Sequence, residues 1–222
     1  MVVSEQEIKM NLNKKNNFIL RNWVLTNYQN MSTSERKELK RKSFHLCCLL
    51  YITGYYFAPQ HLITWIMGIL FFTITTFEFS RIIFPKLNRW WLRNFFIPGA
   101  YRREEIRQPS VLPFTFAGAF FTMLLFPQRP IVLVALLYQV FGDGMAAIIG
   151  QKFGKRRLVR KTLEGSIACF LVCFLVGVFF FNYKIALVGA MVATIVELLF
   201  PYDNLWIPII SALVLHFLTK RI

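Results

Sequence analysis

Seven stretches of this sequence are apolar over enough residues, or nearly enough, to cross a lipid bilayer as helices. A membrane-spanning helix needs about 20 predominantly apolar residues, and a shorter one is accommodated by flanking turns or a locally thinned bilayer. The pattern therefore predicts an all-α, polytopic membrane protein with about seven transmembrane helices. The apolar stretches cover residues 43–58, 62–83, 111–126, 131–150, 165–181, 184–200 and 205–219.

Charge and composition narrow the class of protein further. Lys and Arg number 26 against 11 Asp and Glu, a net charge of +15, while 56% of the residues are hydrophobic. This combination excludes a disordered or acidic chain, and a nucleic-acid-binding protein is basic but not so apolar, so no nucleic-acid partner is expected. The polar N-terminus does not resemble a cleavable signal peptide. Neither a disulfide framework nor a zinc site is indicated by the spacing of Cys47, Cys48, Cys169 and Cys173.

The segments that connect the apolar stretches alternate between two kinds. Residues 59–61, 127–130 and 182–184 are short and nearly uncharged, whereas residues 84–110 and 151–164 are longer and rich in Arg and Lys, as is the segment before the first stretch. Basic loops remain in the cytoplasm. The sequence therefore predicts a cytoplasmic N-terminus and an external C-terminus, in a multi-pass protein of the bacterial cytoplasmic membrane or the endoplasmic reticulum.

Two amphipathic segments are predicted to lie on the cytoplasmic membrane surface. Residues 1–39 form an N-terminal cytoplasmic or interfacial segment, in which apolar residues recur at helical spacing between Leu20 and Met31. In the second segment, Trp90 and Trp91 share an apolar face beside basic residues. Trp next to Arg is typical of a helix at the edge of an anionic lipid bilayer. Amphipathic packing without any lipid role is the alternative.

Eight ionisable residues lie within or at the ends of the predicted spans. Charge is costly there, so a functional role is the default hypothesis. All but Asp143 and His216 map to the predicted cytoplasmic ends, which indicates a site at that face. The eight residues are His45, Glu78, Arg81, Asp143, Glu164, Glu197, Asp203 and His216.

The fourth span contains an acid among small residues. Asp143, Ala146, Ala147 and Gly150 fall on one helical face, so another backbone or a bulky anionic ligand can approach it closely. Small-residue packing between membrane helices is the alternative. That alternative explains the alanines and the glycine, but it does not explain the acid.

Residues 151–166 lead into the fifth span and combine six basic residues with two glycines. Thr162 is placed to cap the following helix, whose first turn would offer free N–H groups, the Ser166 hydroxyl and a positive dipole end to an anion. Lys161 lies just before that turn. The segment predicts a phosphate site, with a basic loop that serves topology alone as the alternative.

Acids also close the sixth span and open the seventh. Asp203 or Asn204 is placed to cap the last helix, near whose first turn Pro208 fits. Capping does not account for Glu197, which lies within an apolar run. Carboxylates near a basic loop indicate Mg²⁺ on nucleotide phosphates, because Mg²⁺ prefers one or two carboxylates together with phosphate oxygens and water.

Six short segments occur in a recognisable order along residues 40–212. They are Arg41-Lys42-Ser-Phe-His45, Glu78-Phe-Ser-Arg81, Arg102…Glu105, Gly142-Asp143-Gly-Met-Ala-Ala-Ile-Ile-Gly150…Phe153-Gly154, Lys161-Thr-Leu-Glu-Gly-Ser166 and Asp203-Asn204…Pro208. This ordered set resembles the CTP-dependent lipid-alcohol kinases, the family of dolichol kinase, phytol kinase and fungal-type diacylglycerol kinase. Residues 40–222 are accordingly expected to form a transmembrane kinase domain.

The resemblance implies transfer of the CTP γ-phosphate to a membrane lipid alcohol at the cytoplasmic face. It implies catalytic roles for Asp143, Lys161 and Glu197 and a Mg²⁺ site at Asp143, Glu197 and Asp203, with Asp143 or Glu197 as the proton acceptor. Diacylglycerol, a polyprenol such as dolichol, and phytol stay open as acceptors. Glu78 and Arg81 are interpreted as a structural ion pair. Nucleotide and phosphate binding is assigned to Arg41, Lys42, His45, Gly150, Gly154, Lys155, Gly165, Ser166 and Asn204.

Three other functions compete with this hypothesis. A CDP-alcohol phosphotransferase should show DGxxAR and two further spaced aspartates, and these are missing after Asp143-Gly144. A CTP-using cytidylyltransferase would release pyrophosphate, whereas the kinase releases CDP. A small transporter would place its acids near the bilayer midplane and often contains an internal repeat.

Overall fold

The computed structural model describes residues 47–95, 108–159 and 161–220. Within these ranges the chain is helical, and strand pairing is limited to an isolated bridge between Arg157 and Thr162. A π-helical turn, Tyr138–Gly142, joins α7 and α8 into one continuous rod. The α-helices are α3 (Cys48–Phe57), α4 (Gln60–Ile83), α5 (Pro85–Phe95), α6 (Leu112–Leu125), α7 (Arg129–Leu137), α8 (Asp143–Phe153), α9 (Leu163–Phe180), α10 (Tyr183–Leu199) and α11 (Asp203–Lys220).

Within the described residues, each of the seven apolar stretches contains a helix or, for the fourth stretch, the α7–α8 rod. Three of these helical segments are long and apolar enough to cross a membrane: α4, the rod Arg129–Phe153, and α9. The chain is therefore an all-α membrane protein. Seven spans stay a prediction, because α3, α6, α10 and α11 are not among these candidates, and α3 and α6 are apolar but shorter than a membrane-spanning helix usually is.

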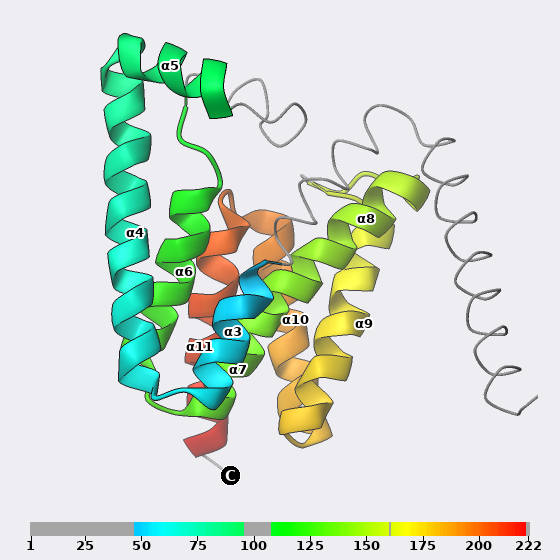
Figure 1. The fold of residues 1–222 in the computed structure, drawn as a ribbon. Coiled ribbons are helices and arrows are strands. Elements are labelled where there is room, and N and C mark those ends of the chain that lie inside the picture. Colours follow the sequence, from blue (N-terminus) through cyan, green and yellow to red (C-terminus); the bar gives the residue numbers. More distant parts are fainter. Residues whose placement is uncertain (1–46, 96–107, 160, 221–222) are drawn as a thin grey trace, which may run out of the picture.

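Successive long helices run in opposite directions (Figure 1). The short connections α3–α4, α6–α7 and α9–α10 lie at one end of the bundle, together with the end of α11. The α8–α9 and α10–α11 connections and α5 lie at the opposite end. The alternation of short and basic connectors along the sequence is thus also a separation in space, and the prediction that the basic end faces the cytoplasm stays a prediction.

The rod lies at the centre of the bundle. Of its most apolar window, 67% of the residues are buried, compared with 17% in α4 and 28% in α9. Large apolar side chains on the peripheral helices point outward instead, and Phe179, Leu50 and Trp65 are 86%, 77% and 71% exposed. In water such a surface would be unstable, so the outward-facing side chains fit a bundle surrounded by lipid.

The predicted ion pair between Glu78 and Arg81 is present and buried. Arg81 Nη2 donates to Glu78 Oε2 at 2.6 Å and to the carbonyl oxygen of Gln108 at 3.2 Å. The same carboxylate oxygen accepts the N–H of Ser110 at 2.8 Å. The pair therefore ties the end of α4 to the start of the α6 segment, which is a structural role.

The second amphipathic segment forms α5, as its spacing predicts. Trp91 packs edge-to-face on Phe77 of α4 with ring centroids 4.6 Å apart, while Trp90 is 53% exposed. Its position on the membrane surface stays a prediction. The first amphipathic segment, between Leu20 and Met31, lies outside the described residues.

Candidate active site

Three carboxylates and one lysine meet at the end of the bundle that carries the basic connections. Carboxylate oxygens of Asp143, Glu197 and Asp203 all lie within 4.8 Å of one another. Lys161 Nζ lies 2.7 Å from Glu197 Oε1, 2.8 Å from Asp203 Oδ2 and 3.7 Å from Asp143 Oδ1. The structure thus brings together the residues to which the sequence assigns catalysis and metal binding.

Each acid comes from a different helix. Asp143 is the first residue of α8 and follows the π-helical turn, a feature that often marks functional sites. Glu197 lies in the last turn of α10 and is completely buried, and Asp203 opens α11. The turn at Pro201 and Tyr202 reverses the chain between α10 and α11, so the last two acids become neighbours.

Lys161 reaches the cluster from a narrow loop that closes on itself. The Leu158 N–H donates to the Lys161 carbonyl oxygen at 2.9 Å, and the Leu163 N–H donates to the Arg156 carbonyl oxygen at 2.9 Å. Thr162 caps α9, as predicted, because its hydroxyl oxygen accepts the N–H of Gly165 at 3.2 Å. These bonds hold Lys161 next to the three carboxylates, on their more exposed side.

The same bonds correct one expectation about the first turn of α9. The sequence predicts that this turn offers free N–H groups to an anion. The Leu163 and Gly165 N–H groups are instead used by the loop and the cap, and the Ser166 N–H donates to the Thr162 carbonyl oxygen at 3.0 Å. Any anion at this end would therefore rely more on side-chain cations than on these backbone groups.

The electrostatics of the cluster favour an additional cation. Partial burial alone would lower the pKa of Lys161, but Asp143, Asp203 and Glu197 outweigh that effect and hold its pKa above the ordinary range. Counted formally, three carboxylates and one ammonium give the cluster a net charge of −2. Hard oxygen ligands with this balance of charge suit Mg²⁺, so the residues present fit the predicted metal.

The first turn of α11 is held by a buried amide. Pro208 lies inside α11, farther from the helix start than the sequence suggests, and it has no N–H to donate to the carbonyl oxygen of Asn204. Gln139 Nε2 donates to that oxygen instead, at 2.8 Å. Asp203 Oδ1 accepts the Asn204 N–H at 2.9 Å while its Oδ2 accepts from Lys161, so this carboxylate pairs with a backbone N–H of the first turn and also joins the cluster.

The glycines assigned to phosphate binding have a packing role in the structure. A Cβ on Gly165 would lie 2.6 Å from the Ala146 carbonyl oxygen, and one on Gly150 would lie 2.7 Å from Thr162 Oγ1. A Cβ on Gly154 would overlap the Gly150 carbonyl oxygen. The small residues that follow Asp143 therefore let the backbone of α9 approach α8. This is the small-residue packing between helices that was the alternative explanation for them.

The other predicted binding residues are placed as follows. Lys155 is exposed in the α8–α9 loop. Asn204 is buried beside Asp203, and its Oδ1 has no hydrogen-bond partner within the part of the chain that the structure describes. Ser166 is buried in the first turns of α9 and faces a groove between α9 and α10. Arg41, Lys42 and His45 lie outside the described residues.

Two further residues lie near the cluster and carry no motif that predicts a role for them. Gln139 is completely buried in the central rod, and a polar amide within an apolar run is the signal that would have found it. Tyr202 adopts a left-handed backbone conformation with φ of 56° and stacks on Phe114, with ring centroids 4.1 Å apart. No local pattern around Pro201-Tyr202 predicts that conformation.

Comparison with known proteins supports part of the resemblance. Over 189 residues, 78% of this chain and 90% of the relative, the sequence is 28% identical to an uncharacterized protein of Rickettsia prowazekii. Over 96 residues, 36% of this chain and 41% of the relative, it is 34% identical to a phytol kinase of Synechocystis sp.. No protein-family model and no solved structure matches the chain. The chain is thus similar in part to a lipid kinase.

Proposed function

We propose that this protein transfers the γ-phosphate of CTP to the hydroxyl group of a membrane lipid alcohol at the cytoplasmic face. The observation that supports this best is the meeting of Asp143, Lys161, Glu197 and Asp203 at the basic end of an apolar helix bundle. The partial similarity to a phytol kinase agrees with it. The acceptor is diacylglycerol, a polyprenol such as dolichol, or phytol.

The proposed reaction is a single displacement at the γ-phosphorus of CTP. The lipid oxygen forms a bond to the γ-phosphorus, the bond from that phosphorus to the β-phosphate oxygen breaks, and CDP leaves. The hydroxyl proton passes to Glu197 or Asp143, the two carboxylates that lie deepest in the cluster. Such a transfer depends mainly on positioning and charge neutralisation, and the cluster supplies groups for both.

Each side chain of the cluster has a distinct task in this proposal. Asp143, Glu197 and Asp203 would hold Mg²⁺, which would supply charge neutralisation at the phosphates. Lys161 turns from the carboxylates to the phosphate oxygens, which are anionic and therefore equivalent partners for its ammonium. Asn204 offers a buried amide beside Asp203, and Lys155 adds positive charge at the loop.

The position of the acids disfavours a transporter. The carboxylates of the cluster gather at one end of the bundle, at the start of α8 and α11 and the end of α10. A transporter would bind its substrate and coupling ions near the bilayer midplane. An enzyme that takes a water-soluble nucleotide and a membrane lipid needs its reacting groups at the membrane–water boundary, and a cluster at one end of an apolar bundle agrees with that requirement.

Purified protein tests the proposal with labelled nucleotide. CTP labelled at the γ-phosphate is given with diacylglycerol, a polyprenol or phytol in separate reactions, and we expect label in one of the lipids together with release of CDP. In a parallel reaction with phosphatidate and CTP labelled at the α-phosphate, label that enters the lipid with release of pyrophosphate would identify a cytidylyltransferase. Full activity in EDTA, or turnover with ATP at least equal to that with CTP, would refute the metal and nucleotide assignments.

A further inference from the structure

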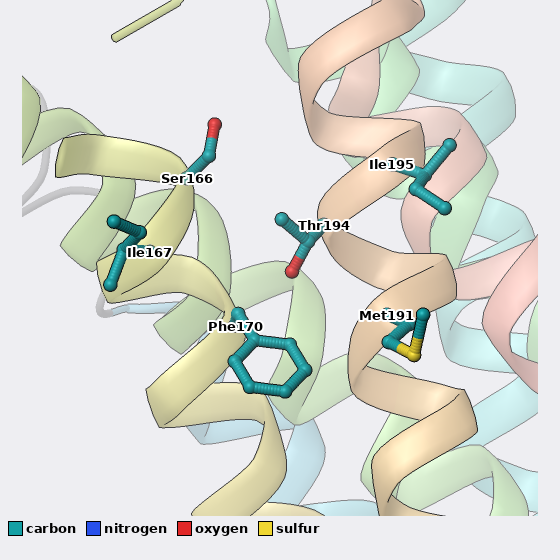
Figure 2. Close-up of a pocket in the computed structure, with 6 residues that line it drawn as sticks. All are labelled: Ser166, Ile167, Phe170, Met191, Thr194 and Ile195. Atoms are coloured by element: carbon teal, nitrogen blue, oxygen red, sulfur yellow. The ribbon is translucent and has the colours of Figure 1, made fainter. Parts of the chain in front are cut away.

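A groove of about 250 Å³ runs between α9 and α10 on the outer surface of the bundle (Figure 2). Three of its lining side chains, Ile167, Met191 and Ile195, are 49%, 48% and 49% exposed, so the groove opens toward the surroundings of the helices. Its walls are almost entirely apolar. The lining residues are Ser166, Ile167, Phe170, Met191, Thr194 and Ile195.

Ser166 is the polar exception in this groove. Its side chain is buried, with the residue only 6% exposed, and its hydroxyl has no hydrogen-bond partner among the described residues. Leaving a buried hydroxyl unpaired is costly, so the hydroxyl indicates a partner from outside the chain. Thr194, the other hydroxyl in the groove, already donates to the carbonyl oxygen of Ala190 at 2.8 Å.

The Ser166 end of the groove is the end nearest the carboxylate cluster. Figure 2 shows the Ser166 hydroxyl at the opposite end of the groove from Phe170 and Met191. Ser166 follows Lys161 by five residues, and on the other wall Glu197 follows Thr194 by three residues, about 4.5 Å farther along the helix axis. The groove therefore leads from the apolar surface toward Glu197 and Lys161.

We propose that this groove holds one hydrocarbon chain of the lipid alcohol, with the lipid hydroxyl hydrogen-bonded to Ser166 and directed toward Glu197. The inference rests on the proposed function and assigns its acceptor site. A hydrocarbon chain is the occupant because the walls are apolar and α9 is a membrane-spanning candidate, so lipid chains are what surrounds the opening. A nucleotide phosphate would find no cation among the lining residues. This assignment moves Ser166 from the phosphate side of the reaction to the acceptor side.

In this proposal the groove orients the lipid alcohol and contributes little to its binding affinity. A lipid chain leaves one apolar environment for another when it enters, so it gains little hydrophobic free energy. A fixed chain does, however, place its hydroxyl at one distance from the cluster, and a displacement of about 1 Å can cost about 10²-fold in rate. A blocked groove should therefore lower kcat for the lipid and leave the KM for CTP unchanged.

Photochemical labelling tests the site without requiring turnover. The full-length protein in phosphatidylcholine vesicles is illuminated with a diacylglycerol or a polyprenol that carries a mid-chain diazirine. We expect labelled peptides to centre on residues 166–170 and 191–195, and excess unlabelled alcohol, but not excess phosphatidylcholine, to suppress them. Labelling spread evenly over the exposed helices, or suppressed equally by phosphatidylcholine, would overturn the proposal.

Filling the groove gives a second, kinetic test. Met191→Trp adds bulk at a half-exposed position, where folding should tolerate it, and we expect it to reduce both groove labelling and kcat for the lipid by about tenfold or more. Ser166→Ala should lower kcat without removing the label. Ile69→Trp on α4, also exposed and apolar, is the matched control and should change neither.

The two tests separate failure of this inference from failure of the proposed function. Groove labelling that Met191→Trp abolishes, without phosphate transfer to any lipid, would keep the lipid site and reject the kinase. Transfer that Met191→Trp and Ser166→Ala leave unchanged would keep the kinase and reject the groove as its acceptor site.

Discussion

Replacing Lys161 by Met should destabilise the protein in the absence of divalent metal. The change takes the formal net charge of the cluster from −2 to −3 and leaves three carboxylates whose oxygens lie within 4.8 Å of one another. Removing one partner costs about 3–5 kcal/mol in a buried ion pair and about 0–1 kcal/mol in an exposed one. Because the Lys161 side chain is 31% exposed and Glu197 is fully buried, we expect about 2–4 kcal/mol.

Thermal unfolding of the detergent-solubilised protein measures this loss. A chain of 150–250 residues loses about 2–4 °C of Tm per kcal/mol, so the variant should unfold roughly 4–16 °C below the parent in EDTA. Mg²⁺ should then recover more stability in the variant than in the parent, because the vacated ammonium position leaves a more negative site. At a hundredfold excess over its Kd, a bound ion contributes about 2.7 kcal/mol.

Two controls make the result specific. KCl at the same ionic strength separates ion binding from screening of the carboxylates. Lys184→Met, at the opposite end of α10, removes an exposed lysine and should shift the Tm little with or without Mg²⁺. A Lys161→Met variant as stable as the parent in EDTA, or an equal Mg²⁺ effect on both proteins, would refute the reasoning that the cluster is short of positive charge.

Three further predictions follow from the site and the topology. Asp143→Asn removes a main electrostatic element of the site, so it should lower turnover of CTP by a factor on the order of 10² or more, while the variant purifies normally. Turnover within a few-fold of the parent would place the site elsewhere. Glu78→Gln removes the buried carboxylate that pairs with Arg81 and should lower the free energy of unfolding by about 3–5 kcal/mol. Activity should fall only as folded protein is lost, and a selective loss of kcat would contradict its structural role. In a background without the native cysteines, an impermeant thiol reagent added outside should label Gln60→Cys but not Lys155→Cys, which is exposed in the α8–α9 loop, and the reverse pattern would invert the topology.

Local sequence patterns were sufficient to predict where the apolar helices lie. Each apolar stretch is a helix because its hydrogen bonds are made within the segment, so hydropathy and end signals carry the information. Thr162 illustrates an end signal, since a threonine before a glycine-containing first turn caps α9 as expected. Asp143 and Glu197 were also recognisable one at a time, because an acid inside an apolar run is costly wherever it occurs.

The relations between segments were decided only by the tertiary structure. Lys161 and Asp203 are 42 residues apart and form a 2.8 Å contact, a pairing that no spacing rule encodes because it depends on how α9, α10 and α11 pack. The same packing places Gly150 and Gly165 in close contact between α8 and α9. It also turns Ser166 toward an apolar groove between two helices.

Sequence by itself therefore determined an apolar, all-helical bundle, the separation of basic from short connectors, and the acids that such a bundle does not tolerate without a partner. The fold decided which acids share one site, which cation lies among them, and which surface leads to them. The physical reason is that helix formation depends on contacts within about four residues, whereas the site depends on contacts between residues such as Gln139 and Asn204, which are 65 positions apart and meet only when the bundle closes.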